Sequence, residues 1–243
     1  MKRTLVIGDI HGGLRALLQV LERASVKKED TLIFLGDYVD GWSESAQLVK
    51  YLIELNQKQK CIFINGNHDV WCYEWLLKGR DINDIWYRNG GKETIVSYQD
   101  GNYNLDEHLQ FFKELKNYYV DEQNRLFIHA GFSSMKGPEN EVYQTNYRWD
   151  RTLWEMAIVM DKRVKKHSSL YPNRLKLYSE IYIGHTPTLH YDSEIPMQGI
   201  NVWNIDTGAA FTGKLTIMDI DTKQFWQSDP LPSLYSEEKG RNK

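Results

Sequence analysis

The chain has 243 residues, of which 41% are hydrophobic and 26% charged, a composition typical of a soluble protein with one substantial domain. Its net charge of −3 excludes the basic surplus that binding to nucleic acid polymers or anionic membranes requires. The first apolar stretch meets Asp9 too early for a signal peptide, and no run approaches the roughly 18 apolar residues of a membrane helix. Cys61 and Cys72 are too few for a disulfide framework, so we expect a cytoplasmic protein.

Short apolar runs that end in polar residues recur along the first three quarters of the chain. They are Thr4–Asp9, Thr31–Asp37, Cys61–Asn67, Arg125–Gly131 and Glu180–Thr186. Their near-continuous hydrophobicity predicts strands that are covered on both faces. Leucines at helical spacing predict helices between the first three runs, over Leu14–Leu21 and over Ser43–Asn56, with Ser43 as the N-cap of the second helix.

The C-terminal part has a different pattern. "NVWNIDTG", "KLTIMDID" and "KQFWQSD" read as consecutive strands, and the last two are joined around Asp221–Thr222. Alternating strands and helices followed by consecutive strands predict an α/β fold of two packed mixed sheets flanked by helices. We expect a single domain over residues 1–236, with a helical excursion at about 70–120 and a loose tail over 237–243.

Polar residues gather where the predicted strands end, and four of the seven histidines are among them. The set is Asp9, His11, Asp37, Asp40, Asn67, His68, His129 and His185. In α/β sheets, ligands bind beyond the carboxyl ends of the strands. Imidazole combined with oxygen ligands suits Mn, Fe, Zn or Ni. Two such ions, roughly 3.5–4 Å apart, neutralise a phosphate ester and activate a water.

Each motif alone has an ordinary structural interpretation, because a capping aspartate or a hydrogen-bonding histidine is common at a strand end. Their joint occurrence in this order is specific. "GDIHG", "GDYVDG", "GNHD", "HAG" and "GHTP" resemble the ordered signature of the calcineurin-like metallophosphoesterases. They are most similar to the phosphoprotein phosphatase branch, which also contains bacterial diadenosine tetraphosphatases. "NIDTGAAFTGKLT" adds to this resemblance, which spans Gly8 to about Thr216.

The resemblance implies two divalent metal ions, with Mn expected and Fe, Zn or Ni as alternatives. Asp9 and His11 would bind the first ion, and Asp37 would bridge both. The second ion would be completed by Asn67, His129 and His185. The resemblance further implies that His68 is the general acid that protonates the leaving group, and that Asp40 orients it.

The chain departs from the family pattern at positions that contact substrate phosphate. Gly41 and Asn65 stand where the family carries arginines, and "GNHD" replaces "GNHE". Loss of two guanidinium groups removes bidentate phosphate contacts that other residues must supply. Arg151, in "RWDRTLW", is the leading replacement, although it could equally be a surface arginine at a helix start. Weaker candidates are Arg148, Arg88 and Lys92.

Aromatic residues surround the motifs in the sequence. Trp42, Trp71, Trp75, Trp86 and Tyr87 could stack on a nucleobase, or they could pack in the core at helical spacing.

Three functions are therefore open. The first is a dinuclear metal-dependent phosphoesterase that acts on phosphomonoesters, like the protein serine/threonine phosphatases. In it a bridging hydroxide attacks phosphorus, and the substrate is a phosphorylated protein or a small phosphoester. The second keeps this metal site and hydrolyses diadenosine tetraphosphate or another nucleotide. The third is a catalytically idle binding module. The oligomeric state is left open.

Overall fold

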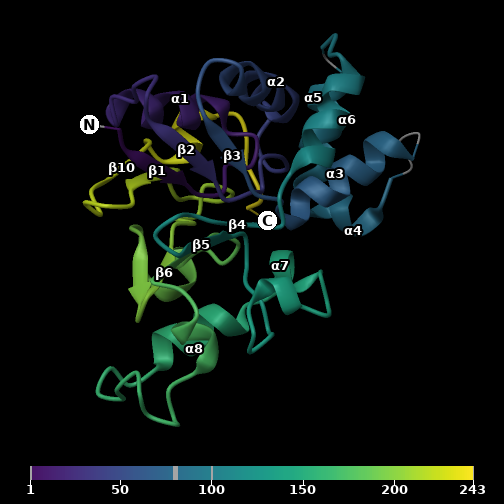
Figure 1. The fold of residues 1–243 in the computed structure, drawn as a ribbon. Helices are drawn as coiled ribbons and strands as arrows, with labels where there is room; N and C mark the ends of the chain where they lie inside the picture. The colour runs from purple at the N-terminus through teal and green to yellow at the C-terminus, as the bar shows by residue number, and fades with distance from the viewer. Residues whose placement is uncertain (1, 79–81, 100, 243) are drawn as a thin grey trace.

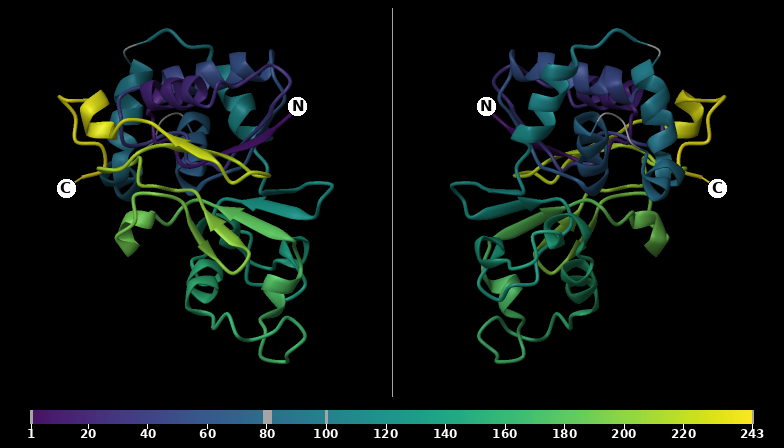
Figure 2. Two further views of the ribbon diagram at one scale, coloured as in Figure 1. Left: turned by 90° about the vertical axis from the view of Figure 1, so that its left-hand side faces the viewer. Right: turned by 90° about the vertical axis from the view of Figure 1, so that its right-hand side faces the viewer.

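The computed structural model describes residues 2–78, 82–99 and 101–242. Two five-stranded mixed sheets pack face to face, with helices on both outer sides (Figure 1; Figure 2). The first sheet has the order β10-β9-β1-β2-β3 and the second the order β4-β5-β6-β8-β7. The prediction of two packed mixed sheets is confirmed. Within the described residues, no helix has both the length and the apolar character needed to cross a membrane.

In the first sheet β1, β2 and β3 are parallel, and β9 and β10 form an antiparallel hairpin beside β1. In the second sheet β5, β6 and β8 are parallel, with antiparallel β4 and β7 at the edges. The strands are β1 (Thr4–Ile7), β2 (Thr31–Phe34), β3 (Cys61–Phe63), β4 (Tyr118–Val120), β5 (Arg125–Ile128), β6 (Glu180–Ile183), β7 (Met197–Gly199), β8 (Val202–Asn204), β9 (Thr216–Asp219) and β10 (Phe225–Gln227). The sequence analysis had not predicted β4 and β7, which are short edge strands.

Alternation along each strand divides its side chains between two cores. In β1, Leu5 and Ile7 face the helices, whereas Val6 packs between the two sheets. In β5, Leu126 lies in the outer core of the second sheet, and Phe127 joins Val6 between the sheets. Because successive side chains of a strand point to opposite faces, a strand covered on both faces must be apolar throughout. This explains the unbroken apolar runs of the sequence.

Most helices cover the first sheet. They are α1 (Leu14–Arg23), α2 (Ser45–Asn56), α3 (Asn67–Leu77), α4 (Asp84–Trp86), α5 (Lys92–Gln99) and α6 (Leu105–Glu114), with a π turn over Tyr87–Gly91 between α4 and α5. Buried side chains from α3, α4, α5 and α6 join the same core as α1 and α2, so the region around 67–114 has no separate core of its own. The helical excursion predicted at about 70–120 includes residues 79–81 and 100, which lie outside the described residues.

The second sheet is covered by less helix. Here α8 (Thr152–Val159) packs Leu153 and Trp154 onto the sheet, preceded by the short α7 (Asn146–Trp149). Short 3-10 turns occupy Pro138–Asn140, Asn173–Lys176 and Thr188–Tyr191, and α9 (Leu231–Leu234) returns to the first sheet.

Glu238 and Arg241, which fall within the expected loose tail over 237–243, make polar contacts with the rest of the described chain. The carboxylate of Glu238 accepts hydrogen bonds from the backbone N–H (2.9 Å) and the hydroxyl (2.7 Å) of Ser43. The N–H of Arg241 donates to the carbonyl of Ala210 at 2.8 Å. Ser43 therefore binds the tail and is not the N-cap of α2, which begins at Ser45. The sequence did not reveal this because the contacts are single polar pairs without a hydrophobic pattern.

Candidate active site

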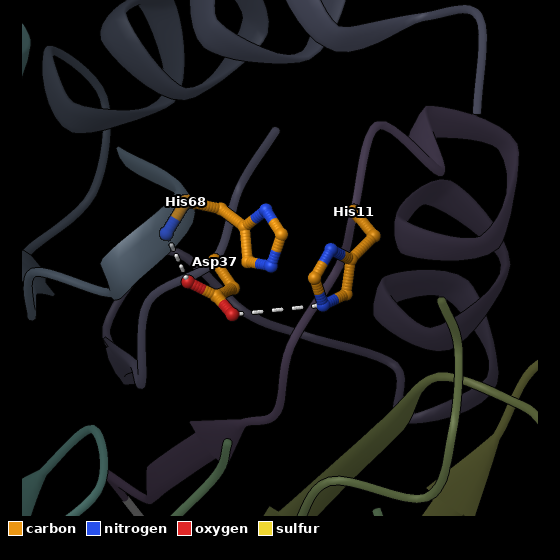
Figure 3. A group of neighbouring side chains, drawn as sticks. All are labelled: His11, Asp37 and His68. Carbon is orange, nitrogen blue, oxygen red and sulfur yellow. Dashed lines mark hydrogen bonds and ion pairs between the residues drawn. The ribbon is translucent and has the colours of Figure 1, made fainter. Parts of the chain in front are cut away.

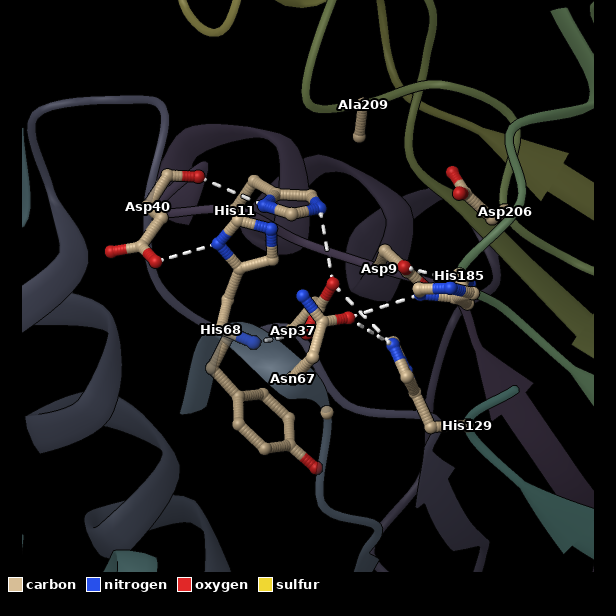
Figure 4. Close-up of polar contacts among 12 residues, drawn as sticks. Asp9, His11, Asp37, Asp40, Asn67, His68, His129, His185, Asp206 and Ala209 are labelled. Carbon is tan, nitrogen blue, oxygen red and sulfur yellow. Dashed lines mark hydrogen bonds and ion pairs between the residues drawn. The ribbon is translucent and has the colours of Figure 1, made fainter. Parts of the chain in front are cut away.

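The loops that follow the parallel strands of both sheets meet at one edge and bring the predicted polar residues together (Figure 4). The buried members are Asp9, His11, Asp37, Asp40, Asn67, His68, His129 and His185. Several of them have left-handed backbones, with φ of 54° at His11, 51° at Asp37, 74° at Asp40 and 67° at His185. Such conformations cost free energy in residues other than glycine and concentrate at functional sites.

Asp37 lies at the centre of the cluster. Its Oδ2 is 3.7 Å from Nε2 of His11 and 3.4 Å from Nε2 of His129, while its Oδ1 accepts the N–H of His68 at 3.0 Å (Figure 3 shows the His11 and His68 contacts). A side chain at Gly66 would collide with this carboxylate, so the close approach of the β3 loop requires glycine. One carboxylate therefore faces histidines from both sheets.

Backbone carbonyls fix the orientation of two of these histidines. Nδ1 of His11 donates to the carbonyl of Asp40, and Nδ1 of His129 donates to the carbonyl of Leu35, both at 2.8 Å. A carbonyl can only accept, so Nε2 of each ring is left to face Asp37. Hydrogen bonds of this kind set the tautomer of metal-binding histidines.

Asn67 joins the second pair of rings. Its Oδ1 lies 3.3 Å from Nε2 of His129 and 3.0 Å from Nδ1 of His185. As the first residue of α3, Asn67 is placed by the turn at Gly66, where the carboxylate of Asp69 accepts the N–H groups of Gly66, Asp37 and Tyr38 at 2.8 Å each. Asp69, the aspartate of "GNHD", therefore holds the loop after β2 and the loop after β3 together.

His68 and Asp40 form a separate buried pair. Nδ1 of His68 lies 2.6 Å from Oδ2 of Asp40, which also accepts the indole N–H of Trp86 at 2.7 Å. The hydroxyl of Thr94 donates to the other oxygen of Asp40 at 2.7 Å. Burial lowers the pKa of His68 to about 3 and raises the pKa of Asp40 to about 8, because it disfavours charge on either group. The contacts of Asp40 hold the His68 ring in one orientation.

The donor set fits two cations that share Asp37. One group contains His11, Asp37 and His68, and the other contains Asp37, His129 and His185. Oδ1 of Asp9 and Nε2 of His185 are buried and have no hydrogen-bond partner among the described residues. Unpaired buried polar atoms are costly, and a metal ion would satisfy them. Imidazole and carboxylate donors, with no thiolate, are the chemistry of borderline divalent metals.

The electrostatics of the cluster also favour cations. Burial raises the pKa of Asp9 well above its usual value, and the charge of Asp206 raises it further. Burial opposes a proton on His129, yet the charges of Asp37 and Asp9 raise the pKa of His129 to about 10. Without metal, the proton on His129 supplies a positive charge beside Asp37 and Asp9.

A pocket of about 280 Å³ opens onto the cluster. Its lining includes Trp71, Trp149, Arg151, Asp206, Phe211 and Arg241. Of the arginines considered from the sequence, Arg151 thus lies at the pocket. Arg148 instead donates to Asn117 at 3.2 Å, and among the described residues neither Arg88 nor Lys92 lines the pocket.

The aromatic residues divide between core and pocket. Trp42, Trp75 and Trp86 are buried in the core of the first sheet, as the packing interpretation predicts. Trp71 lines the pocket and contacts Trp149 edge to face, with ring centroids 5.3 Å apart. Tyr87 is exposed and is not among the lining residues described.

The sequence analysis missed two charged residues of the site. Asp206 follows β8, and the strand-end rule that found the other ligand candidates would have found it in "NIDTG". Arg241 lies in the C-terminal tail, where no pattern in the sequence indicated a role.

A two-sheet α/β sandwich whose loops gather two His/Asp groups around one shared carboxylate defines a metal-dependent hydrolase. The sequence model of the calcineurin-like phosphoesterases matches residues 2–204. The chain belongs to the calcineurin-like phosphoesterase family, as its motifs indicated, and is a metal-dependent phosphoester hydrolase.

Relatives with curated names are similar over most of their length. An asymmetrical bis(5′-nucleosyl)-tetraphosphatase, PrpE, of Anoxybacillus flavithermus is 26% identical over 235 residues, covering 88% of each chain. The protein of the same name from Bacillus thuringiensis is 25% identical over 237 residues, again covering 88% of each.

Solved structures share the fold at lower identity. A protein serine/threonine phosphatase of Saccharomyces cerevisiae, similar to human phosphatase PP5, superposes with a TM-score of 0.60 at 14% identity, covering 94% of this chain and 80% of that one. A metallophosphoesterase from Sphaerobacter thermophilus gives a TM-score of 0.56 at 18% identity, covering 94% and 89%.

Proposed function

We propose that the protein is a dinuclear metal-dependent hydrolase of nucleoside polyphosphates, of the diadenosine tetraphosphate type. Asp9 and His11 would hold one ion, Asn67, His129 and His185 would hold the other, and Asp37 would be shared between the two. Manganese is the expected metal, with Fe, Zn or Ni as alternatives. When bound, the ions polarise the phosphoryl group and lower the pKa of a bound water towards neutrality.

His68 acts as the proton donor to the leaving oxygen. Its Nδ1 is engaged with Asp40, so Nε2 is the nitrogen free to deliver a proton into the pocket, which His68 lines. His68 also lies in the first candidate metal group, and one nitrogen cannot both bind an ion and donate a proton. The contact with Asp40 supports the proton-donor role, since it holds the ring in one orientation and leaves Nε2 for proton transfer.

The aromatic lining of the pocket carries the substrate assignment. Trp71, Trp149 and Phe211 line the pocket together with charged, neutral polar and aliphatic residues, and Trp149 keeps 45% of its surface exposed. Exposed aromatic faces beside a phosphate site suit stacking on a nucleobase. The names of the relatives agree with this choice, and Arg151 would contact one of the phosphates.

A second candidate is a phosphomonoesterase that acts on phosphoserine or phosphothreonine. The observation in its favour is the His68–Asp40 pair, because an alkoxide leaving group needs a proton more than a nucleotide phosphate does. A cytoplasmic location stays a prediction based on the two free thiols, Cys61 and Cys72.

Kinetics measured in parallel on a dinucleotide and on a phosphopeptide would distinguish the nucleotide hydrolase from the phosphomonoesterase. With Mn²⁺ bound, we expect kcat/KM for diadenosine tetraphosphate to exceed that for a phosphoserine peptide. Trp149→Ala should raise KM for the dinucleotide by about 10-fold, since stacking contributes about 1–3 kcal/mol per base, and leave p-nitrophenyl phosphate unaffected. Tyr143→Ala, an exposed aromatic outside the pocket lining, is the matched control. A large preference for the peptide would exclude the nucleotide assignment.

A further inference from the structure

The C-terminal tail packs on the loop after β2 and places Arg241 in the lining of the pocket. Trp42, from the loop after β2, stacks on Tyr235 with centroids 5.2 Å apart, and its indole N–H donates to Ala209 at 2.7 Å. A side chain at Gly240 would meet the Trp42 ring within 2.6 Å. The tail therefore lies directly on the loop that carries Asp37 and Asp40, and Figure 2 shows this end of the chain at the level where the two sheets meet.

Gly41 provides the space for Arg241. A Cβ built at Gly41 would lie 3.4 Å from Cγ of Arg241, and one built at Gly90 would lie 3.2 Å from the same atom. These two glycines are themselves joined, because the N–H of Gly41 donates to the carbonyl of Gly90 at 3.3 Å. The aliphatic part of the Arg241 side chain therefore lies against the backbone of Gly41 and Gly90. A larger residue at position 41 would occupy this path.

The guanidinium of Arg241 reaches the pocket without an anionic partner. It stands 5.3 Å from the centroid of Phe211, and no hydrogen bond or ion pair of its side chain is found within the described part of the chain. Its Nε is buried and unpaired. A buried N–H that meets no acceptor costs free energy, and an anion in the pocket would complete it.

Arg241 and Arg151 line the same pocket, and the charge of each acts on groups of the cluster. Burial is the main cause of the low pKa of His11 and His68, and the charge of Arg241 lowers both further. Burial raises the pKa of Asp40 and Asp206, and the charge of Arg241 opposes this rise. Burial lowers the pKa of His185, and the charge of Arg151 contributes to this lowering. Two arginines therefore line one pocket and could bind different oxygens of one anionic substrate.

We propose that Arg241 is a substrate-binding residue that contacts phosphoryl oxygens. A C-terminal strap, formed by residues 235–242, places this side chain in the site. The inference rests on the proposed function, because it assigns the phosphate contact of that same site. Glu238, which binds Ser43, and Gly240, which lies on Trp42, act as positioning residues of the strap. The arginine that the "GDYVDG" motif lacks at Gly41 is thus supplied through space from the far end of the sequence.

Kinetics of Arg241→Ala on p-nitrophenyl phosphate, with Mn²⁺ saturating, test the inference. We expect KM and the inhibition constant of inorganic phosphate to rise about 10- to 100-fold, because hydrogen bonds to charged groups contribute about 1.5–3 kcal/mol. The bound manganese should be unchanged. Arg241→Lys should recover only part of the loss, since lysine cannot make the bidentate contact. Lys239→Ala, an exposed cation of the same strap, is the matched control and should behave as wild type.

A binding readout separates phosphate contact from folding. Saturating inorganic phosphate should raise the melting temperature of the wild-type protein clearly more than that of Arg241→Ala. Glu238→Gln should weaken phosphate inhibition less than Arg241→Ala does, because Arg241 itself is retained. An active wild type whose Arg241→Ala variant keeps its KM and its phosphate inhibition would overturn the inference. A wild type with no hydrolase activity under any metal would instead remove the proposed function.

Discussion

The two ends of strand β2 carry buried carboxylates with opposite surroundings. Asp30 precedes the strand and is completely paired by its own chain: it accepts from the guanidinium of Arg3 at 2.6 and 3.2 Å, from the N–H of Arg3 at 3.1 Å and from the N–H of Lys27 at 3.0 Å. Asp37 follows the strand, and its oxygens face histidines from two sheets. The chain provides a fixed positive charge for Asp30 and none for Asp37.

This difference separates a carboxylate that stabilises the fold from one that serves chemistry. Arg3 is always charged, so the Asp30 pair is satisfied at any neutral pH. Burial raises the pKa of Asp37, and the charges of His129, His68 and His11 together lower it well below its usual value. That lowering depends on imidazoles that a metal ion would keep neutral. A functional carboxylate can be recognised because the side chains around it would bind an added cation better than they pair with one another.

Asp37→Asn should have the largest effect on activity. Losing the shared carboxylate removes a ligand from both ions, so we expect turnover to fall about 10⁴-fold or more and bound manganese to fall below two ions per chain. The asparagine can still accept the His68 N–H, so the metal-free protein should melt close to wild type. Metal analysis together with calorimetry checks both statements. Two tightly bound ions in this variant would contradict the shared position of Asp37.

His68→Asn should have a smaller effect and of a different kind. We expect kcat to fall about 10²- to 10⁴-fold with both metal ions retained, because only proton donation is removed. The loss should be greater for alkyl phosphates than for p-nitrophenyl phosphate, whose leaving group needs no proton. Loss of an ion from this variant would assign His68 as a ligand of the first metal instead.

Asp30→Asn should change stability and leave turnover intact. Removing the charge-assisted contacts of a fully buried carboxylate should cost about 1.5–3 kcal/mol at pH 7. Burial raises the pKa of Asp30, but the hydrogen bonds and charge of Arg3 lower it below the usual value. Its contribution is therefore complete above the unfolded pKa, about 4, and is lost as the pH falls through the folded pKa.

Urea titrations of wild type and Asp30→Asn at several pH values measure this difference. The gap between the two proteins should be full at pH 7 and should narrow below about pH 4. A gap that does not change with pH would mean that packing, and not the charge of Asp30, provides the stability. A change in kcat at neutral pH would show that the two ends of β2 are not independent.

Several features of the protein follow from the sequence alone. Unbroken apolar runs predicted strands covered on both faces, and the strand-end positions of Asp9, Asp37 and His129 predicted one polar cluster. These predictions work because parallel strands deliver their following residues to a common edge of a sheet. The edge strands β4 and β7 were missed since each has only three residues, too few for a pattern, and most of these are only partly buried. Trp42 was undecided because a buried and a stacking tryptophan have the same neighbours in sequence.

What only the tertiary structure decided is that Arg241 lies at the same pocket as Arg151. The sequence determined the fold class and the cluster around Asp37, since both depend on local patterns repeated from strand to strand. Arg241 is 200 residues away from Gly41, and its place depends on the pairing of Glu238 with Ser43 and on the contact between Gly240 and Trp42. Such single contacts between distant segments have no periodicity, so they become visible only when the chain is folded.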